Sequence, residues 1–137
     1  MAIPASLRRE VRERAEERCE YCGLAAAAQE AAFHIDHIIP VVAGGLTNLD
    51  NLALACVSCS LRKGARLEAP DPRSGKMEVL FHPRFDSWRR HFRWEGERVI
   101  GLSPTGRATI AALNMNRPLV LAIRREETIR GRHPPPL

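Results

Sequence analysis

Four cysteines form two equivalent pairs in this chain of 137 residues. Cys19 and Cys22 make one pair, Cys56 and Cys59 make the other, and two residues separate the sulfurs in each. A turn of this spacing points both thiolates inward, and two such turns complete a tetrahedral Zn²⁺ site. Because four sulfurs leave no open position, the predicted zinc ion is structural. A redox role is disfavoured because two equivalent pairs are present.

Three polar side chains lie between the cysteine pairs, on an otherwise apolar stretch. These residues are His34, Asp36 and His37. A carboxylate beside an imidazole suits metal-assisted hydrolysis of a phosphodiester, since the carboxylate binds a hard cation and the imidazole takes a proton from water. On a strand, His34 and Asp36 would share one face and His37 would lie on the other. Asp36 and His37 can therefore act together only if the strand twists or ends, and Pro40 favours an end.

The motif as a whole resembles the HNH endonucleases over roughly residues 19–64. The matching residues are Cys19-x-x-Cys22, His34-Ile-Asp36-His37-Ile-Ile-Pro40, Gly44-Gly45, Asn51-Leu52 and Cys56-x-x-Cys59-Ser60-x-x-Lys63. The resemblance implies an α+β fold. Its centre is a small ββα-metal core, or HNH/His-Me finger, held together by the four-cysteine zinc site, with an N-terminal helix and a C-terminal α+β extension. It also implies a DNA substrate, cut to leave 5′-phosphate and 3′-hydroxyl ends.

The resemblance further implies a role for each matching residue. His37 is the general base, Asp36 binds a catalytic divalent metal, and Asn51 holds the catalytic loop through backbone hydrogen bonds. The last family position is usually Asn or His, but here it is Ser60, whose hydroxyl is a poorer neutral ligand. His34 could supply the missing ligand, so we expect a metal site of Asp36, His34, Ser60 and water. Mg²⁺ or Mn²⁺ is the expected ion, with Zn²⁺ and Ni²⁺ as further candidates.

Short elements must position these residues. Helical spacing predicts a helix over residues 5–18, and β-branched or apolar runs predict strands at 33–40 and 51–56, followed by a helix over 57–65. In the second half the corresponding patterns predict strands at 77–81 and 99–102 and helices at 84–94, 105–116 and 119–130.

This order of elements predicts three parts along the chain. Residues 1–68 are expected to form the nuclease core with its N-terminal helix and zinc knuckles. Residues 69–130 are expected to form an α+β extension packed on the core, and residues 131–137 a disordered tail.

The composition agrees with an acidic partner but supports it weakly. The chain has 21 Lys and Arg against 16 Asp and Glu, a formal charge of +5. Four zinc-bound thiolates would lower that charge to about +3. Arg62, Lys63 and Arg66 follow the predicted metal-site helix, and we expect them to contact DNA phosphates.

The sequence also bears on the compartment. No apolar run approaches the about 20 residues of a membrane span, and the first residues lack the apolar stretch of a secretory signal. We therefore expect no membrane association and a cytoplasmic, reducing compartment, in which disulfides are disfavoured. The oligomeric state stays open.

Two other classes of function compete with a nuclease. The first is a catalytically degenerate, zinc-containing module that binds nucleic acid, and Ser60 together with the basic charge favours it. The second is a protein–protein adaptor built on a zinc ribbon, and only the cysteines favour it.

Overall fold

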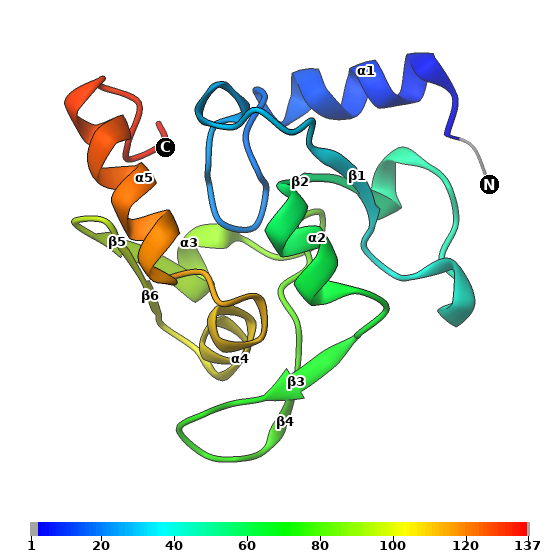
Figure 1. Ribbon diagram of the computed structural model, residues 1–137. Coiled ribbons are helices and arrows are strands. Elements are labelled where there is room, and N and C mark those ends of the chain that lie inside the picture. The colour runs from blue at the N-terminus through cyan, green and yellow to red at the C-terminus, as the bar shows by residue number, and fades with distance from the viewer. Residues whose placement is uncertain (1–2, 137) are drawn as a thin grey trace. The chain divides into compact units, whose positions relative to one another are not determined.

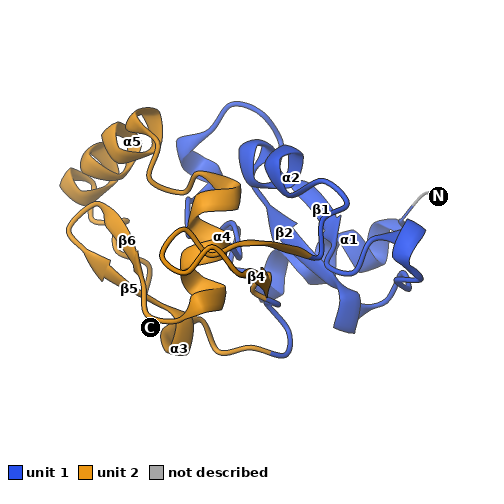
Figure 2. Cartoon of the chain, turned by 90° about the horizontal axis from the view of Figure 1, so that it is seen from below, with its two compact units in different colours: residues 1–67, 82–85 blue, residues 68–81, 86–137 orange. Residues whose placement is uncertain are grey.

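The computed structural model describes residues 3–136, which form two compact units (Figure 2). Unit 1 comprises the described residues up to Leu67, together with His82–Phe85. Unit 2 comprises Glu68–Phe81 and the described residues from Asp86 onward. Helices and small antiparallel strand pairs occur in both, so the predicted α+β class is confirmed.

Unit 1 contains a strand pair with a helix directly after it. Its helices and strands are α1 (Ala5–Arg14), β1 (His34–His37), β2 (Leu52–Ala55) and α2 (Val57–Lys63) (Figure 1). Short 3₁₀ turns lie at Ala26–Ala28, Val41–Ala43 and Leu49–Asn51. β1 pairs antiparallel with β2, which places Asp36 opposite Ala53 and His37 opposite Leu52. The polar cluster is thereby fixed against a strand that is buried along its whole length.

The core of unit 1 joins α1 to β2. Val11, Leu52 and Leu54 are almost fully buried and pack together, because each carries an apolar side chain on the inner face of its element. The N-terminal helix ends at Arg14, four residues earlier than predicted. Arg14 donates hydrogen bonds to the carbonyls of Leu49 and Leu52, at 2.9 and 2.7 Å, which ties the helix end to the start of β2.

A turn replaces the last predicted turn of that helix. Glu16 and Glu17 have φ values of 54° and 55°, in the left-handed region, so the helix cannot continue through them. The chain leaves this turn directly into the first cysteine pair.

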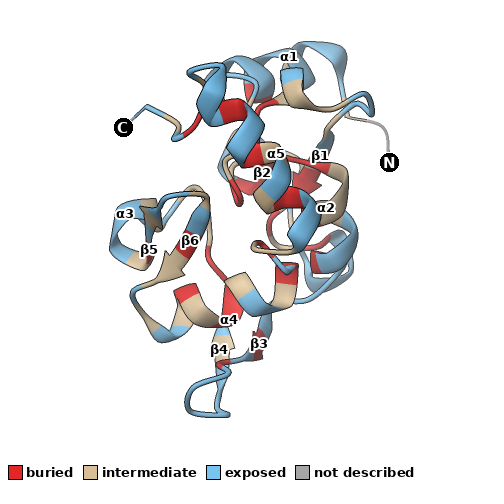
Figure 3. Ribbon diagram, turned by 60° about the vertical axis from the view of Figure 1, so that its left-hand side comes forward, coloured by how far each residue is buried: buried red, intermediate tan, exposed pale blue. Residues whose placement is uncertain are grey.

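Unit 2 contains two strand pairs and three helices among its described residues. Its elements are β3 (Glu68–Pro70), β4 (Met77–Val79), α3 (Trp88–His91), β5 (Phe92–Glu95), β6 (Arg98–Gly101), α4 (Pro104–Leu113) and α5 (Pro118–Ile129). β3 pairs with β4 and β5 with β6, both antiparallel. Helix α4 has one buried side and one exposed side, and its buried residues include Ala108, Thr109 and Leu113 (Figure 3).

The helix predicted over residues 84–94 is wrong. Only Trp88–His91 is helical, and Phe92 begins strand β5. Phe92 and Trp94 are two residues apart, so the same apolar side chains fit either spacing. Gly96, with φ 61°, makes the turn that lets residues 98–101 pair back onto β5. Tertiary pairing therefore overrides the helical spacing of the aromatics.

Two polar contacts hold parts of unit 2 in place. Arg107 donates to both carboxylate oxygens of the buried Asp71, at 3.0 and 2.9 Å. Hydrogen bonds from this guanidinium lower the pKa of Asp71 to about 2. His133, in the segment expected to be a disordered tail, is buried, and its Nε2 hydrogen-bonds the Gly96 carbonyl at 2.9 Å.

Candidate metal sites and active-site pocket

The four cysteine sulfurs of unit 1 lie together in its interior. All lie within 4.8 Å of one another, and all four cysteines are buried. In each knuckle, the backbone N–H of the second cysteine lies 3.4 Å from the sulfur of the first. The sulfurs of Cys22 and Cys56 are 3.8 Å apart, which is about the edge of a tetrahedron with Zn–S bonds of roughly 2.3 Å. The donor set and its size therefore fit a structural zinc ion.

The charge of the four-cysteine cluster also favours a bound cation. Burial, followed by contacts with the neighbouring sulfurs, raises the pKa of the Cys19 thiol well above its usual range. Four thiolates in one buried cluster therefore need a cation to compensate them, which zinc would provide.

Glu20 attaches the first knuckle to the strand pair. Its backbone N–H donates to the Leu54 carbonyl, and its carboxylate accepts the Leu54 N–H, both at 2.8 Å. The carboxylate also pairs with Arg84 of the same unit. Cys56 follows β2 directly and is the N-cap of α2, so both knuckles are anchored to the end of one strand.

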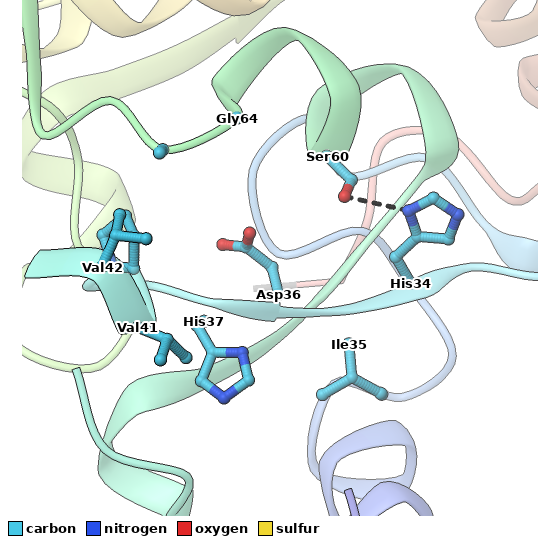
Figure 4. Close-up of a pocket in the computed structure, with 10 residues that line it drawn as sticks. His34, Ile35, Asp36, His37, Val41, Val42, Ser60 and Gly64 are labelled. Carbon is cyan, nitrogen blue, oxygen red and sulfur yellow. Dashed lines mark hydrogen bonds between the residues drawn. The ribbon is translucent and has the colours of Figure 1, made fainter. Parts of the chain in front are cut away.

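A cavity of about 340 Å³ is lined by residues of strand β1, of helix α2 and of the segments that follow them (Figure 4). Its lining residues are His34, Ile35, Asp36, His37, Pro40, Val41, Val42, Ser60, Gly64 and Ala65. Figure 4 shows His34 and Asp36 pointing from β1 toward α2, while His37 points to the other side of the strand. Strand β1 ends at His37, and both residues of the Asp-His pair line the cavity.

Asp36 is held by two buried partners. Its Oδ2 accepts a 2.8 Å hydrogen bond from the Tyr21 hydroxyl and lies 3.2 Å from the Lys63 ammonium. Both contacts use Oδ2, so neither engages Oδ1. Burial raises the pKa of Asp36, while Lys63 and Tyr21 act in the opposite direction. Lys63 and Tyr21 thus favour the charged carboxylate, the form that can bind a metal ion.

His37 and Asn51 organise the loop that follows β1. The His37 Nε2 hydrogen-bonds the Thr47 hydroxyl at 2.9 Å. The Asn51 side chain accepts from the Ile39 N–H at 2.8 Å and donates to the carbonyls of Ile39 and Leu46, at 3.0 and 2.9 Å. Asn51 thereby ties both ends of the loop together through backbone groups.

Gly45 is required by the tightness of that loop. A Cβ atom at this position would overlap the backbone carbonyl of Ile39 and would meet the Asn51 amide at 2.8 Å. Any larger residue would have to push away the group that Asn51 binds, so the second glycine of the Gly44-Gly45 pair has a steric cause.

His34 and Ser60 meet on the α2 side of the cavity. The His34 Nδ1 and the Ser60 Oγ are 2.9 Å apart, as the dashed line in Figure 4 marks. With Asp36 they offer one carboxylate, one imidazole and one hydroxyl on one side of the cavity. Oxygen and imidazole donors of this kind are suitable for Mg²⁺, Mn²⁺ or Zn²⁺.

The three basic residues expected at DNA phosphates differ in position. Arg62 and Arg66 are exposed, and each hydrogen-bonds within its own turn, Arg62 to Ser58 and Arg66 to the Arg62 carbonyl. Lys63 is 2 % exposed, and its ammonium contacts Asp36 and the His37 carbonyl. Its position therefore differs from the expected phosphate contact, because on α2 it faces inward while its neighbours face solvent.

Two residues of the site carry no signal in the sequence. Tyr21 lies inside the first cysteine knuckle, and Thr47 lies in the loop after the glycine pair. Neither belongs to a recognisable pattern, because their contacts with Asp36 and His37 depend on how distant segments fold together.

The paired cysteine knuckles and the ββα arrangement define a small metal-associated α+β domain. Residues 19–66 match the family model described as HNH endonuclease. The comparisons with curated proteins and with solved structures each gave no match. The matched segment covers about a third of the chain, and the family that it matches indicates a metal-using nuclease with a nucleic-acid substrate.

A helix that spans a membrane needs about 20 consecutive apolar residues. Within residues 3–136, every helix is too short or too polar to cross a bilayer.

Proposed function

We propose that this protein is a metal-dependent DNA endonuclease that hydrolyses phosphodiester bonds. The observation that carries the proposal is the shared cavity: Asp36 and His37 border one space, and Asn51 holds the loop beside it. A carboxylate and an imidazole on two adjacent residues that line one cavity are the groups that metal-assisted hydrolysis needs.

His37 is the proposed general base. Its Nε2 is engaged by Thr47, so Nδ1 is the ring nitrogen left to accept a proton from the attacking water. For Nδ1 to carry a free lone pair, the proton of the neutral ring must be on Nε2, which then donates to the Thr47 hydroxyl. Thr47 therefore selects the tautomer and fixes the ring.

Asp36, His34 and Ser60 are the proposed ligands of the divalent ion. Asp36 would bind through Oδ1, since Tyr21 and Lys63 engage Oδ2. When bound, the ion would neutralise the phosphate and stabilise the departing 3′ oxygen. His34 and Ser60 would have to give up their mutual hydrogen bond or share it with a bound water.

Arg62 and Arg66 are the proposed phosphate contacts. Both are exposed: Arg62 lies in the last turn of α2, and Arg66 lies in the segment just after it. Their contribution would be electrostatic and would fall as salt rises. We further propose that residues 1–68 form the nuclease core and residues 69–130 an added α+β extension.

A plasmid-nicking assay tests the proposal. Supercoiled DNA is incubated with the zinc-loaded protein and Mg²⁺ or Mn²⁺, in parallel with His37→Ala and with His91→Gln as a control outside the site. We expect metal-dependent nicking that is retained in His91→Gln and falls by about 10²-fold or more in His37→Ala. Nicking that survives in His37→Ala would contradict the assigned base.

The same assay tests His34 as a ligand. His34→Ala should raise the metal concentration needed for half-maximal nicking, because one donor is lost. If metal-dependent cleavage is unchanged in His34→Ala, His34 is not a ligand.

The direct His34–Ser60 contact favours one rival, a catalytically degenerate module that binds nucleic acid. In that case the two side chains would satisfy each other and bind no ion. DNA that is retarded in a gel but never cut, with any divalent metal, would support this rival. Absence of any interaction with DNA would support a protein–protein adaptor.

A further inference from the structure

The carboxylate that lines the cavity is already paired with a cation. Among the lining residues Asp36 alone is acidic, and the Lys63 ammonium lies 3.2 Å from its Oδ2. Lys63 is 2 % exposed and Asp36 is 9 % exposed, so solvent screens the pair little. Lys63 also donates to the His37 carbonyl at 3.1 Å, which fixes the ammonium at the end of β1.

The charges at this site therefore cancel before any divalent ion binds. Asp36 contributes one negative charge and Lys63 one positive charge, while a hydroxyl and a metal-binding imidazole, which must be unprotonated, contribute none. A divalent ion on Asp36 would leave the site with two positive charges close to the Lys63 ammonium. Like charges in a partly buried site repel strongly, so binding to the free protein is disfavoured.

A phosphodiester supplies the missing negative charge. We propose that Lys63 is a positioning residue and internal counter-ion, which makes divalent-ion binding at Asp36 depend on bound nucleic acid. The inference rests on the proposed function, since it takes Asp36 as the metal ligand. Because the coupling is reciprocal, the ion also strengthens the binding of the phosphodiester. Free protein would then hold little catalytic metal, and its empty site would be stabilised by Lys63.

Mn²⁺ binding, measured by electron paramagnetic resonance at pH 8, tests this inference without turnover. The zinc-loaded protein of 137 residues carries His37→Ala in every sample so that a short DNA duplex stays uncut. We expect the duplex to tighten Mn²⁺ binding at least tenfold. We expect Lys63→Met to tighten Mn²⁺ binding at least tenfold without DNA and to reduce the effect of the duplex. Lys63→Arg keeps the charge and should retain weak binding.

Asp36→Ala, with the same duplex, corrects for Mn²⁺ bound elsewhere and separates the two claims. If Asp36→Ala leaves Mn²⁺ binding unchanged, the ion does not bind at Asp36 and the proposed function loses its metal site. If Asp36→Ala removes binding but Lys63→Met binds Mn²⁺ no more tightly than the parent, only the role of Lys63 is refuted. If Lys63→Met fails to retain zinc, the test is made on the parent protein, which carries only His37→Ala. Equal Mn²⁺ affinity of that protein with and without duplex would overturn the inference.

Discussion

The two nitrogens of the His37 ring have different surroundings. Nε2 is hydrogen-bonded to Thr47, whereas Nδ1 takes no part in that contact. A base that is held by one nitrogen and reacts through the other needs its partner for orientation more than for charge. Thr47 therefore contributes to the proposed reaction although it would touch no reacting atom.

Thr47→Val tests that role. The substitution removes the hydroxyl but keeps the size of the side chain, so the ring can rotate and adopt the other tautomer. We expect kcat for plasmid nicking to fall roughly tenfold, with KM for DNA nearly unchanged. Thr47→Ser restores the hydroxyl and should recover most of kcat. Equal losses in Thr47→Val and Thr47→Ser would mean that the hydroxyl does not act on His37.

At the same scale, the sequence predicts the proposed reactive residues but not the partners that hold them. His34, Asp36 and His37 stand together in the sequence, so their chemistry is visible in one short segment. Tyr21 and Thr47 lie 15 and 10 residues away from the side chains that they bind. The burial of Lys63 is likewise invisible, because Arg62 and Lys63 are adjacent basic residues on one helix and only packing distinguishes them.

At the scale of elements, the cysteine cluster connects the start of unit 1 to helix α2. Cys56 is the N-cap of α2 and Cys59 lies in its first turn, while Cys19 and Cys22 are tied to β2 through Glu20. A structural zinc ion would therefore hold α2, and with it Ser60 and Lys63, against β1. Without the ion, the two knuckles would lose the metal–sulfur bonds that join them to each other.

Removal of zinc should therefore unfold unit 1 before unit 2. A strong chelator at neutral pH takes the ion from the thiolates and leaves few other constraints on the knuckles. The single Tyr, Tyr21, lies in unit 1, and both Trp residues, Trp88 and Trp94, lie in unit 2, so the two can be followed separately. We expect the tyrosine near-ultraviolet circular dichroism signal to be lost and tryptophan emission to persist. Unchanged tyrosine signal after zinc release would contradict a structural role for the ion.

Local signals predicted most elements of both units, but they failed at α3 and β5. The cysteine turns and Pro40 act over a few residues, so β1, β2 and α2 were placed to within a few residues of their observed bounds. The aromatic residues at 88, 92 and 94 fit a helix and a strand equally well. The pairing of β5 with β6 determines that residues 92–95 form a strand, and a single sequence does not reveal such pairing.

At the scale of the whole molecule, the positive charge is unevenly divided. Unit 2 carries twelve Lys and Arg residues against eight Asp and Glu, whereas unit 1 carries nine against eight. Four zinc-bound thiolates would make unit 1 slightly negative. If the substrate is DNA, as we propose, most of the electrostatic attraction for it would come from unit 2, while the proposed chemistry belongs to unit 1.

The acid stability of unit 2 should depend on Asp71. Its folded pKa of about 2 lies below the ordinary value of 3.8, so the ion pair with Arg107 stabilises the fold above pH 4. That stabilisation is lost as the pH falls from about 4 toward 2. We expect the difference between the parent and Asp71→Asn, in urea unfolding followed by tryptophan emission, to be largest above pH 4 and to vanish near pH 2. A difference that stays constant with pH would argue against an ionised Asp71 as the cause.

Chemical rescue of the proposed base tests the central claim most directly. In His37→Gly, a space replaces the imidazole while the backbone carbonyl that Lys63 binds is retained. The measurement is the rate of plasmid nicking with Mg²⁺ or Mn²⁺ as free imidazole is added at pH 8. We predict that nicking is lost in His37→Gly and is restored in proportion to imidazole, whereas Asp36→Ala is not rescued. Nicking by His37→Gly at the parent rate, independent of imidazole, would contradict it.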